Sequence, residues 1–520
     1  LGNLNTAAEL FAEVIRKDPK NAAAMYELSR VYSDQKKYAD ALYFSKNAYK
    51  LSPQNVWYAM NYAEVLQHND RYKESAEVYE ELIHDHPEEM NYYQELANAW
   101  IYAGDYGEGI KAYSRMEEQF GKTGDVAVIE ARLYQQLKKT EKAIAELEEW
   151  VAMDSSDVQA YGMLAELYQS TGKNQQALDI YQHILRIDPE NAFVHLSLAD
   201  YYRTAGEKEK SVSELKLAFQ NKSLDIETKI SILGSYYALV ETYPELKDQA
   251  IEMCKLLVQS HPNDPRSHAV YADFLIQEKK LEEARNQYRQ AKQLGSKEYS
   301  VHSQILYIDS QLQDIDAMLS DSEEALSLFP DQPFIYFFNG LAKHQKKRDA
   351  DAASVLSGGV KMVVDNVPLE IQFYSTLGEV YHELKDYEKS DQNYERALAL
   401  DDKDASTLNN YAYFLSLRKI KLDKAEELSK RSNELEPNQA SYEDTYGWIM
   451  FTMGKMQEAK EWIGKSLQHG GDKSAAVLEH YGDVLNSIGD KSGALDYWKR
   501  AKEAGDEASP ELDQKLQKIK

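Results

Sequence analysis

The sequence has little or none of what several protein classes need. Cys254 is the only cysteine in 520 residues, so the chain forms no internal disulfide. No stretch approaches the run of about 18 apolar residues that spans a bilayer as a helix. Basic residues number 60 against 87 acidic ones, and the formal charge of −27 argues against nucleic acid as a partner. The acidity either serves solubility or favours basic partners.

Motifs for catalysis and cofactor binding are also missing. Gly121-Lys122-Thr123 and Gly464-Lys465-Ser466 resemble the end of a phosphate-binding loop. Met116 and Ala459 stand where the first glycine of that motif belongs, and neither stretch follows a strand pattern. No zinc motif, nucleophile elbow or paired carboxylates rises above chance. The sequence therefore predicts no catalytic residue, no cofactor, no metal site and no enzyme.

Repetition is what the sequence has in abundance. Small residues recur every 34 positions in two series that lie twelve residues apart. The first series is Ser29, Ala63, Ala97, Ala131, Ala165 and Ala199, and the second is Ala41, Ser75, Gly109, Ala143, Ala177 and Ser211. Apolar or small residues at i, i+3, i+4 and i+7 surround both series, which predicts two amphipathic helices per period. Small side chains at these positions allow helix axes to approach to about 8–10 Å.

The repeated residues resemble the tetratricopeptide repeat (TPR), with its pattern W-x2-L-G-x2-Y, A-x3-F and P. The residues that carry the resemblance are Tyr161, Leu164, Ala165, Tyr168, Ala177, Tyr181 and Pro189, and then Tyr374, Leu377, Gly378, Tyr381, Tyr394 and Ala397. The resemblance covers nearly the whole chain. It implies an all-α fold, a right-handed superhelical α-solenoid of about 14–15 repeats, with a C-terminal capping helix.

Changes in the period suggest how the array is organised. We expect an N-terminal array (1–225, first repeat partial), an elongated unit (226–264), a middle array (265–366), a C-terminal array (367–505) and a capping helix (506–520). The glycines and proline within 358–370 mark either a joint between sub-arrays or ordinary repeat degeneracy. Leu512, Leu516 and Ile519 form the apolar stripe expected of the cap. The chain starts at the turn of a repeat without a methionine, so we expect it to begin inside a longer protein.

Two histidines and the cysteine occupy positions that other repeats fill with tyrosine. His268 and His302 stand one repeat apart in the slot of Tyr161, and Cys254 stands in the slot of Tyr181. We therefore expect all three to be buried packing residues.

A concave groove, lined by the first helix of each repeat, is the surface that the family uses for binding. Counted from the start of each unit, the second, fifth, ninth and twelfth residues face this groove, and most of them are polar. Apolar exceptions are candidate protein-binding anchors, although they could equally serve packing within the array. These candidates are Tyr26, Trp57, Met60, Ile101, Phe193, Leu196, Phe334, Phe337 and Leu341.

The last hundred residues resemble bacterial outer-membrane TPR lipoproteins through three segments. These are Asn409-Asn410-Tyr411-Ala412-Tyr413, Asp444-Thr445-Tyr446-Gly447-Trp448 and Glu479-His480-Tyr481-Gly482-Asp483. The resemblance implies a non-catalytic adaptor for a protein partner, such as a periplasmic protease to which it presents substrates. Its expected location is the periplasm, anchored to the outer membrane through a lipidated N-terminus outside this sequence, with the cytoplasm as the alternative. Two other functions stay open: a structural subunit of an envelope assembly or secretion complex, and the targeting half of an enzyme whose catalytic domain lies upstream.

Overall fold

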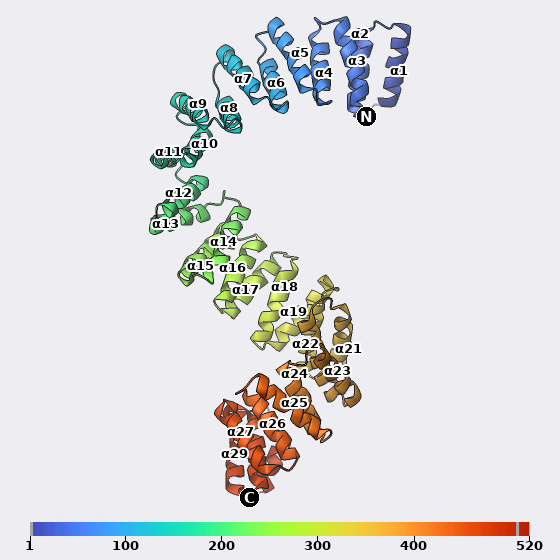
Figure 1. Ribbon diagram of the computed structural model, residues 1–520, viewed down its shortest axis with the longest axis vertical. Coiled ribbons are helices and arrows are strands. Elements are labelled where there is room, and N and C mark those ends of the chain that lie inside the picture. Colours follow the sequence, from blue (N-terminus) through green and yellow to red (C-terminus); the bar gives the residue numbers. More distant parts are fainter. Residues whose placement is uncertain (1–3, 506–508, 519–520) are drawn as a thin grey trace. The chain divides into compact units, whose positions relative to one another are not determined.

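The computed structural model describes residues 4–505 and 509–518, which form thirty α-helices and three short 3-10 helices without any β-strand. Contacts divide the chain into two compact units, with the boundary between Lys229 and Ile230. Successive helices pack side by side as pairs within each unit (Figure 1). The expected all-α array of helix pairs is confirmed.

The N-terminal unit holds one leading helix and six complete pairs. Its helices are α1 (Leu4–Lys17), α2 (Ala22–Asp34), α3 (Tyr38–Leu51), α4 (Val56–Gln67), α5 (Tyr72–Asp85), α6 (Met90–Tyr102), α7 (Tyr106–Phe120), α8 (Gly124–Gln136), α9 (Thr140–Met153), α10 (Val158–Ser170), α11 (Asn174–Ile187), α12 (Ala192–Thr204) and α13 (Lys208–Gln220). The boundary between the units falls inside α14 (Ile226–Val240). Even-numbered helices from α2 to α28 are the first helix of their pair, here called helix A, and each following helix is helix B.

The C-terminal unit continues the alternation. Its helices are α15 (Lys247–Ser260), α16 (Pro265–Gln277), α17 (Leu281–Gln293), α18 (Tyr299–Gln311), α19 (Ile315–Leu328), α20 (Pro333–Gln345), α21 (Asp349–Gly359), α22 (Val367–Glu383), α23 (Tyr387–Leu400), α24 (Ala405–Leu417), α25 (Leu422–Leu435), α26 (Ala440–Thr452), α27 (Met456–Gln468), α28 (Ala475–Ser487), α29 (Lys491–Ala504) and α30 (Leu512–Lys518). The 3-10 helices are η1 (Pro244–Leu246), η2 (Val360–Met362) and η3 (Gly471–Lys473).

The turn between helix A and helix B repeats one backbone conformation. In the N-terminal unit, one residue per turn has a positive φ, and these residues stand 34 apart. They are Lys36 (58°), Asp70 (57°), Gly104 (77°), Lys138 (56°), Gly172 (76°) and Gly206 (78°). The next residue donates its N–H to the last turn of helix A, as from Lys37 to the carbonyl of Tyr32 at 2.8 Å. This left-handed C-cap ends helix A and reverses the chain within three residues.

The two series of small residues lie where helix A crosses helix B. Ala63 and Ala41 are fully buried, as are most of their counterparts. Where serine replaces alanine on helix B, its hydroxyl donates to a helix A carbonyl twelve residues earlier. The bond runs from Ser75 Oγ to the Ala63 carbonyl at 2.9 Å and from Ser390 Oγ to the Gly378 carbonyl at 2.7 Å. A buried hydroxyl is tolerated here because its partner is built into the crossing.

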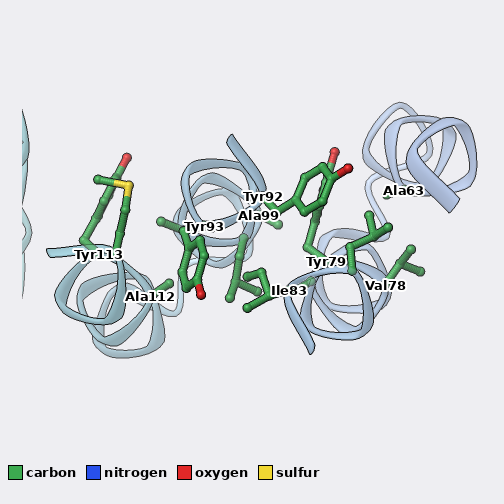
Figure 2. Packing of buried hydrophobic residues seen from close by; sticks show 14 of the residues in the cluster. Ala63, Val78, Tyr79, Ile83, Tyr92, Tyr93, Ala99, Ala112 and Tyr113 are labelled. Atoms are coloured by element: carbon green, nitrogen blue, oxygen red, sulfur yellow. The ribbon is translucent and has the colours of Figure 1, made fainter. Parts of the chain in front are cut away.

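Large side chains fill the space between successive pairs. Figure 2 shows Tyr79 and Ile83 of α5, Tyr93 of α6 and Tyr113 of α7 within one such cluster. All of these side chains are buried, and the cluster extends from α4 to α8. Because each pair buries its apolar faces only against its neighbours, the core is linear.

The expected packing of the two histidines and the cysteine is confirmed. Cys254 is fully buried, and this burial together with Asp273 raises the pKa of its thiol. His268 is buried and bonds Gln287 through Nδ1 at 2.7 Å, while buried His302 lies edge-on to Phe329.

Two irregular stretches have local explanations. The long unit gains its length between α14 and α15, where η1 is inserted at Pro244. In the second stretch, Gly359 ends α21 in close contact with the next helix. A Cβ on Gly359 would lie 2.5 Å from Tyr336 Cβ and 2.9 Å from the Phe373 ring. This glycine therefore serves close packing against the helices on either side of α21.

The C-terminal helix α30 covers the last pair. Leu512 is buried against α28 and α29, with Leu516 beside it. Lys515 Nζ bonds Glu479 Oε1 and Asp483 Oδ2, each at 2.6 Å. The predicted capping role is confirmed for these residues, whereas Ile519 lies outside the described part of the chain. Among the described residues, no helix has the length and apolarity required to cross a membrane.

Candidate functional site

The helix A surface of the N-terminal unit carries two adjoining cavities. One has a volume of about 600 Å³ and lies over α6 and α8, and the other, of about 420 Å³, lies over α8, α10 and α12. Val128, Arg132 and Gln159 line both of them. We call this continuous surface the N-terminal groove. Its other lining residues include Met90, Gln94, Asn98, Ile129, Gln135, Gly162, Met163, Glu166, Phe193 and Ser197.

Repeat geometry explains why these side chains meet. Val128, Arg132 and Gln159 occupy the fifth, ninth and second positions of their units, three of the four positions expected to face the groove. Gly162 stands at the fifth position of α10, and an added Cβ would meet nothing within 4 Å. The absent side chain widens the groove beside Gln159 and Phe193.

The polar lining of the groove combines side-chain amides, one arginine and the carboxylates of Glu95, Asp125 and Glu166. Gln94, Asn98, Gln135 and Gln159 each offer both a donor and an acceptor, which matches the alternating groups of a polypeptide backbone. Arg132 is exposed and has no ion-pair or hydrogen-bond partner among the described residues. Its guanidinium donors are therefore available to a ligand.

Most other arginines of this unit are engaged by carboxylates. Arg115 bonds Glu80 at 2.7 Å, and Arg71 bonds Glu74. In a chain with a large excess of acid, an arginine left without a carboxylate in the middle of a groove stands out from this pattern.

Six predicted anchor residues lie in the N-terminal unit, and their exposure differs widely. Trp57 is 66% exposed and Phe193 is 64% exposed, so both rings face solvent. Met60 and Ile101 are partly buried against the α4–α8 cluster, and Leu196 packs beside α13. Phe193 is the one of the six that lines the groove cavities.

The sixth residue, Tyr26, is partly buried. Its ring centroid lies 5.1 Å from that of Tyr58, and the Arg30 guanidinium lies over the ring at 5.5 Å. These contacts fix the Tyr26 ring at the surface of the first pairs. A role for it in binding stays a prediction.

The three anchors predicted in the C-terminal unit contribute mainly to the core. Phe337 is only 8% exposed, and its ring centroid lies 5.4 Å from those of both Phe338 and Phe373. Phe334 and Leu341 are partly buried in the same cluster. Packing within the array therefore requires Phe337, although one edge of its ring lines a cavity of about 420 Å³ over α20, α22 and α24.

Sequence reasoning missed Arg132, Gln159 and Gly162. The positional rule does point to them, because they stand at groove-facing positions of their units. An apolar criterion for anchors selects none of the three, because they are an arginine, an amide and a glycine. Whether a charged side chain such as Arg132 lacks an ion-pair partner depends on the folded structure, and the spacing of residues in the sequence does not predict it.

Three carboxylates, one buried and two partly buried, meet between α7, α8 and α9. Ligand atoms of Glu117, Glu130 and Glu146 lie within 4.8 Å of one another, which makes them the candidate metal ligands within the described ranges. Lys122 Nζ contacts Glu146 and lies 3.0 Å from Glu149 and 3.9 Å from Glu117. The lysine thus already supplies a cation to this cluster.

Burial sets the protonation of two of these carboxyls. It raises the pKa of Glu130 to about 8 and that of Glu117 to about 7, with neighbouring carboxylates adding to the effect. Ser114 Oγ donates to Glu130 Oε1 at 3.2 Å. Near neutral pH, Glu130 is therefore largely protonated while Lys122 stays charged.

Family models described as tetratricopeptide repeat match residues 1–42, 32–99, 158–191 and 371–404. Two curated relatives come from Pseudomonas aeruginosa. TPR repeat-containing protein PA4667 is 25% identical over 162 residues, which cover 31% of this chain and 26% of the relative. Type IV pilus assembly protein PilF is 28% identical over 113 residues, which cover 22% of this chain and 45% of the relative. The chain thus spans less than half the length of either relative.

Among solved structures, the APC/C hetero-tetramer Cut9–Hcn1 aligns at a TM-score of 0.42 with 11% identity, covering 95% of this chain and 96% of the matched chain. The family-model matches agree with the helix pairs and their period of 34 residues. Proteins of this repeat type are generally scaffolds for protein interactions. The chain contains tetratricopeptide repeats in the segments that these models match.

Proposed function

We propose that this chain is a non-catalytic scaffold that holds a protein partner in the N-terminal groove and acts in a bacterial cell envelope. The observation that carries the proposal is the pair of adjoining cavities that share Val128, Arg132 and Gln159. Side-chain amides suit the backbone of an extended segment, Arg132 suits a carboxylate, and Phe193 offers an aromatic surface.

The envelope role rests on the last repeats and on the relatives. The three C-terminal segments resemble outer-membrane TPR lipoproteins, and both curated relatives are bacterial. The proposed activity is that of an adaptor that presents substrates to a periplasmic protease. Membrane attachment would then come from a lipidated segment outside this sequence.

The test is affinity capture from a bacterial envelope extract with the full chain and two groove variants. Phe193→Ala and Arg132→Ala each remove a ligand-facing group from an exposed position. We expect each to weaken retention of the partner at least about tenfold, because an interface hot spot contributes about 2 kcal/mol or more. Quantitative mass spectrometry of the bound proteins measures the loss.

Tyr43→Ala on helix B is the matched control, because Tyr43 is 65% exposed and lies outside the groove. Retention that is unchanged in both groove variants would reject the groove as the binding surface. Recovery of a protease together with its substrates would support the adaptor.

A structural subunit of an envelope assembly complex is the second candidate, favoured by the match to PilF. Stoichiometric recovery of an assembly or secretion complex, lost with helix B variants such as Tyr43→Ala and kept by the groove variants, would establish it instead.

A further inference from the structure

The cavity over α20, α22 and α24 in the C-terminal unit combines an apolar wall with an acidic rim. Phe337, Pro368 and Ile371 form the apolar part, and the volume is about 420 Å³. Asp401 and Asp404 are the charged residues of its lining, which contains neither lysine nor arginine. We call it the C-terminal cavity.

The sequence builds this cavity through one lengthened helix. Helix α22 has 17 residues, whereas α20 and α24 have 13 each. Asn366 caps its start by accepting from the N–H of Leu369 at 3.1 Å, and Pro368 occupies its first turn. The added turn places Val367 and Pro368 beside the start of α24 and encloses the cavity.

The two carboxylates are fixed by the backbone. Asp404 Oδ2 accepts from the N–H of Thr407 at 3.0 Å as the N-cap of α24, and Asp401 Oδ1 accepts from the N–H of Lys403 at 2.9 Å. Neither forms an ion pair within the described chain, whereas the intervening Asp402 binds Arg431 at 2.6 Å. Each carboxylate has acceptor capacity left over, and each is held in place before a ligand arrives.

Exposed apolar side chains continue from the cavity along the preceding connection. Val367, which lines the cavity, is 45% exposed, and Val364 is 78% exposed. A partner that reaches the cavity therefore also meets apolar surface.

We propose that the C-terminal cavity accepts a lysine or arginine side chain of a partner polypeptide, flanked by an apolar residue. The alkyl stem packs on Phe337, Pro368 and Ile371, while the cationic end bonds Asp401 and Asp404. The formal charge of −27 on the whole chain favours approach of a basic segment over an acidic one. The C-terminal cavity shares no lining residue with the N-terminal groove, so the two proposals are tested independently.

The test selects a random-peptide display library on the full chain and on three variants. Asp401→Asn and Asp404→Asn remove charge and keep side-chain shape, and asparagine also preserves the N-cap at 404. Asp402→Asn is the matched control on the adjacent, outward-facing carboxylate. We expect peptides with lysine or arginine beside apolar residues to be enriched on the wild type and on Asp402→Asn.

Fluorescence anisotropy with one enriched peptide then measures affinity. We expect Asp401→Asn and Asp404→Asn each to weaken it at least about tenfold, and replacement of the peptide's basic residue by norleucine to do the same. Equal affinity for all variants, or no basic enrichment, overturns the proposal. Binding of arginine amide as tightly as the peptide overturns the polypeptide as occupant.

Discussion

At the scale of single residues, this structure stands out for the ionisable groups it buries. Glu130 is only 2% exposed, and its neighbours include two further carboxylates and one lysine. A carboxyl in such surroundings keeps its proton at pH values far above its ordinary pKa. Its protonation is therefore linked to the stability of α7, α8 and α9.

The sign of this linkage follows from the raised pKa. The pKa of Glu130 is 4.5 in the unfolded chain and about 8 in the folded chain. At pH values between these two, the folded chain holds a proton on Glu130 that the unfolded chain has released. This contribution to stability is present at low pH and is lost as the pH rises through 8. Glu117, with its pKa raised to about 7, acts in the same direction.

We therefore expect Glu130→Gln to stabilise α7–α9 at pH values above 8 and to have little effect near pH 5. Glutamine imitates the protonated carboxyl and cannot ionise. One pKa unit corresponds to about 1.4 kcal/mol, and the pKa of Glu130 rises from 4.5 to about 8. The gain at high pH should therefore reach at most about 5 kcal/mol, and solvent screening of the ionised carboxylate lowers it to about 2 kcal/mol. Hydrogen-exchange protection factors of α8 amides at both pH values measure it.

The control for this prediction is Glu118→Gln, which changes an exposed carboxylate on the same helix as Glu117. This change should leave the pH dependence of the α8 protection factors as it is in the wild type. A Glu130→Gln protein that is no more stable than wild type at high pH would show that ionisation of Glu130 does not destabilise the fold, and so that the pKa of Glu130 is not raised.

At the scale of helices, the distance between the two helices of a pair depends on side chains at one crossing. In the pair α26 and α27, the residue at the crossing is Gly447. A Cβ there would lie 2.5 Å from Ile463 Cγ1 and 3.0 Å from its backbone nitrogen. The close backbone approach leaves no room for relaxation by rotamer change alone.

Gly447→Ala should therefore cost about 1–3 kcal/mol, and Gly447→Leu should open the pair and the units that follow it. Limited proteolysis and hydrogen exchange over residues 440–505 report the opening. The matched change is Gly464→Ala on α27, where an added Cβ meets only Tyr481 at 3.9 Å. It should stabilise the helix by about 0.5–1 kcal/mol. Equal effects at the two glycines would contradict the assigned crossing.

At the scale of the whole molecule, two compact units and a linear core govern stability. Each pair contacts chiefly its neighbours, so the stability of a unit is close to a sum of local terms. Loss of one pair need not unfold distant pairs. This distinguishes the array from a globular domain with one shared core.

Thermal unfolding of the full chain should accordingly depart from a single two-state transition. We expect a van 't Hoff enthalpy clearly below the calorimetric enthalpy. Gly447→Ala should lower only the component from the C-terminal unit and leave that of residues 4–229 in place. Equal enthalpies, or a uniform shift of the whole transition, would show that the two units unfold as one.

The sequence by itself determined the helix pairs, their period, the small-residue crossings and the capping helix, because all of these follow from periodic constraints. Residues 34 positions apart occupy equivalent places in successive helix pairs, so the pattern of one repeat predicts that of the next. It also determined that Cys254 and His302 are buried, since they share slots with packing tyrosines.

Only the tertiary structure decided which groove-facing residues are available to a partner. The positional rule treats Trp57 and Phe337 alike, yet the first is 66% exposed and the second 8%. The difference arises because Phe373 of the next pair covers Phe337, a contact between repeats that no single period contains. The unpartnered Arg132, the protonated Glu130 and the cavity beside Asp404 likewise depend on side chains of different repeats, which only folding brings together.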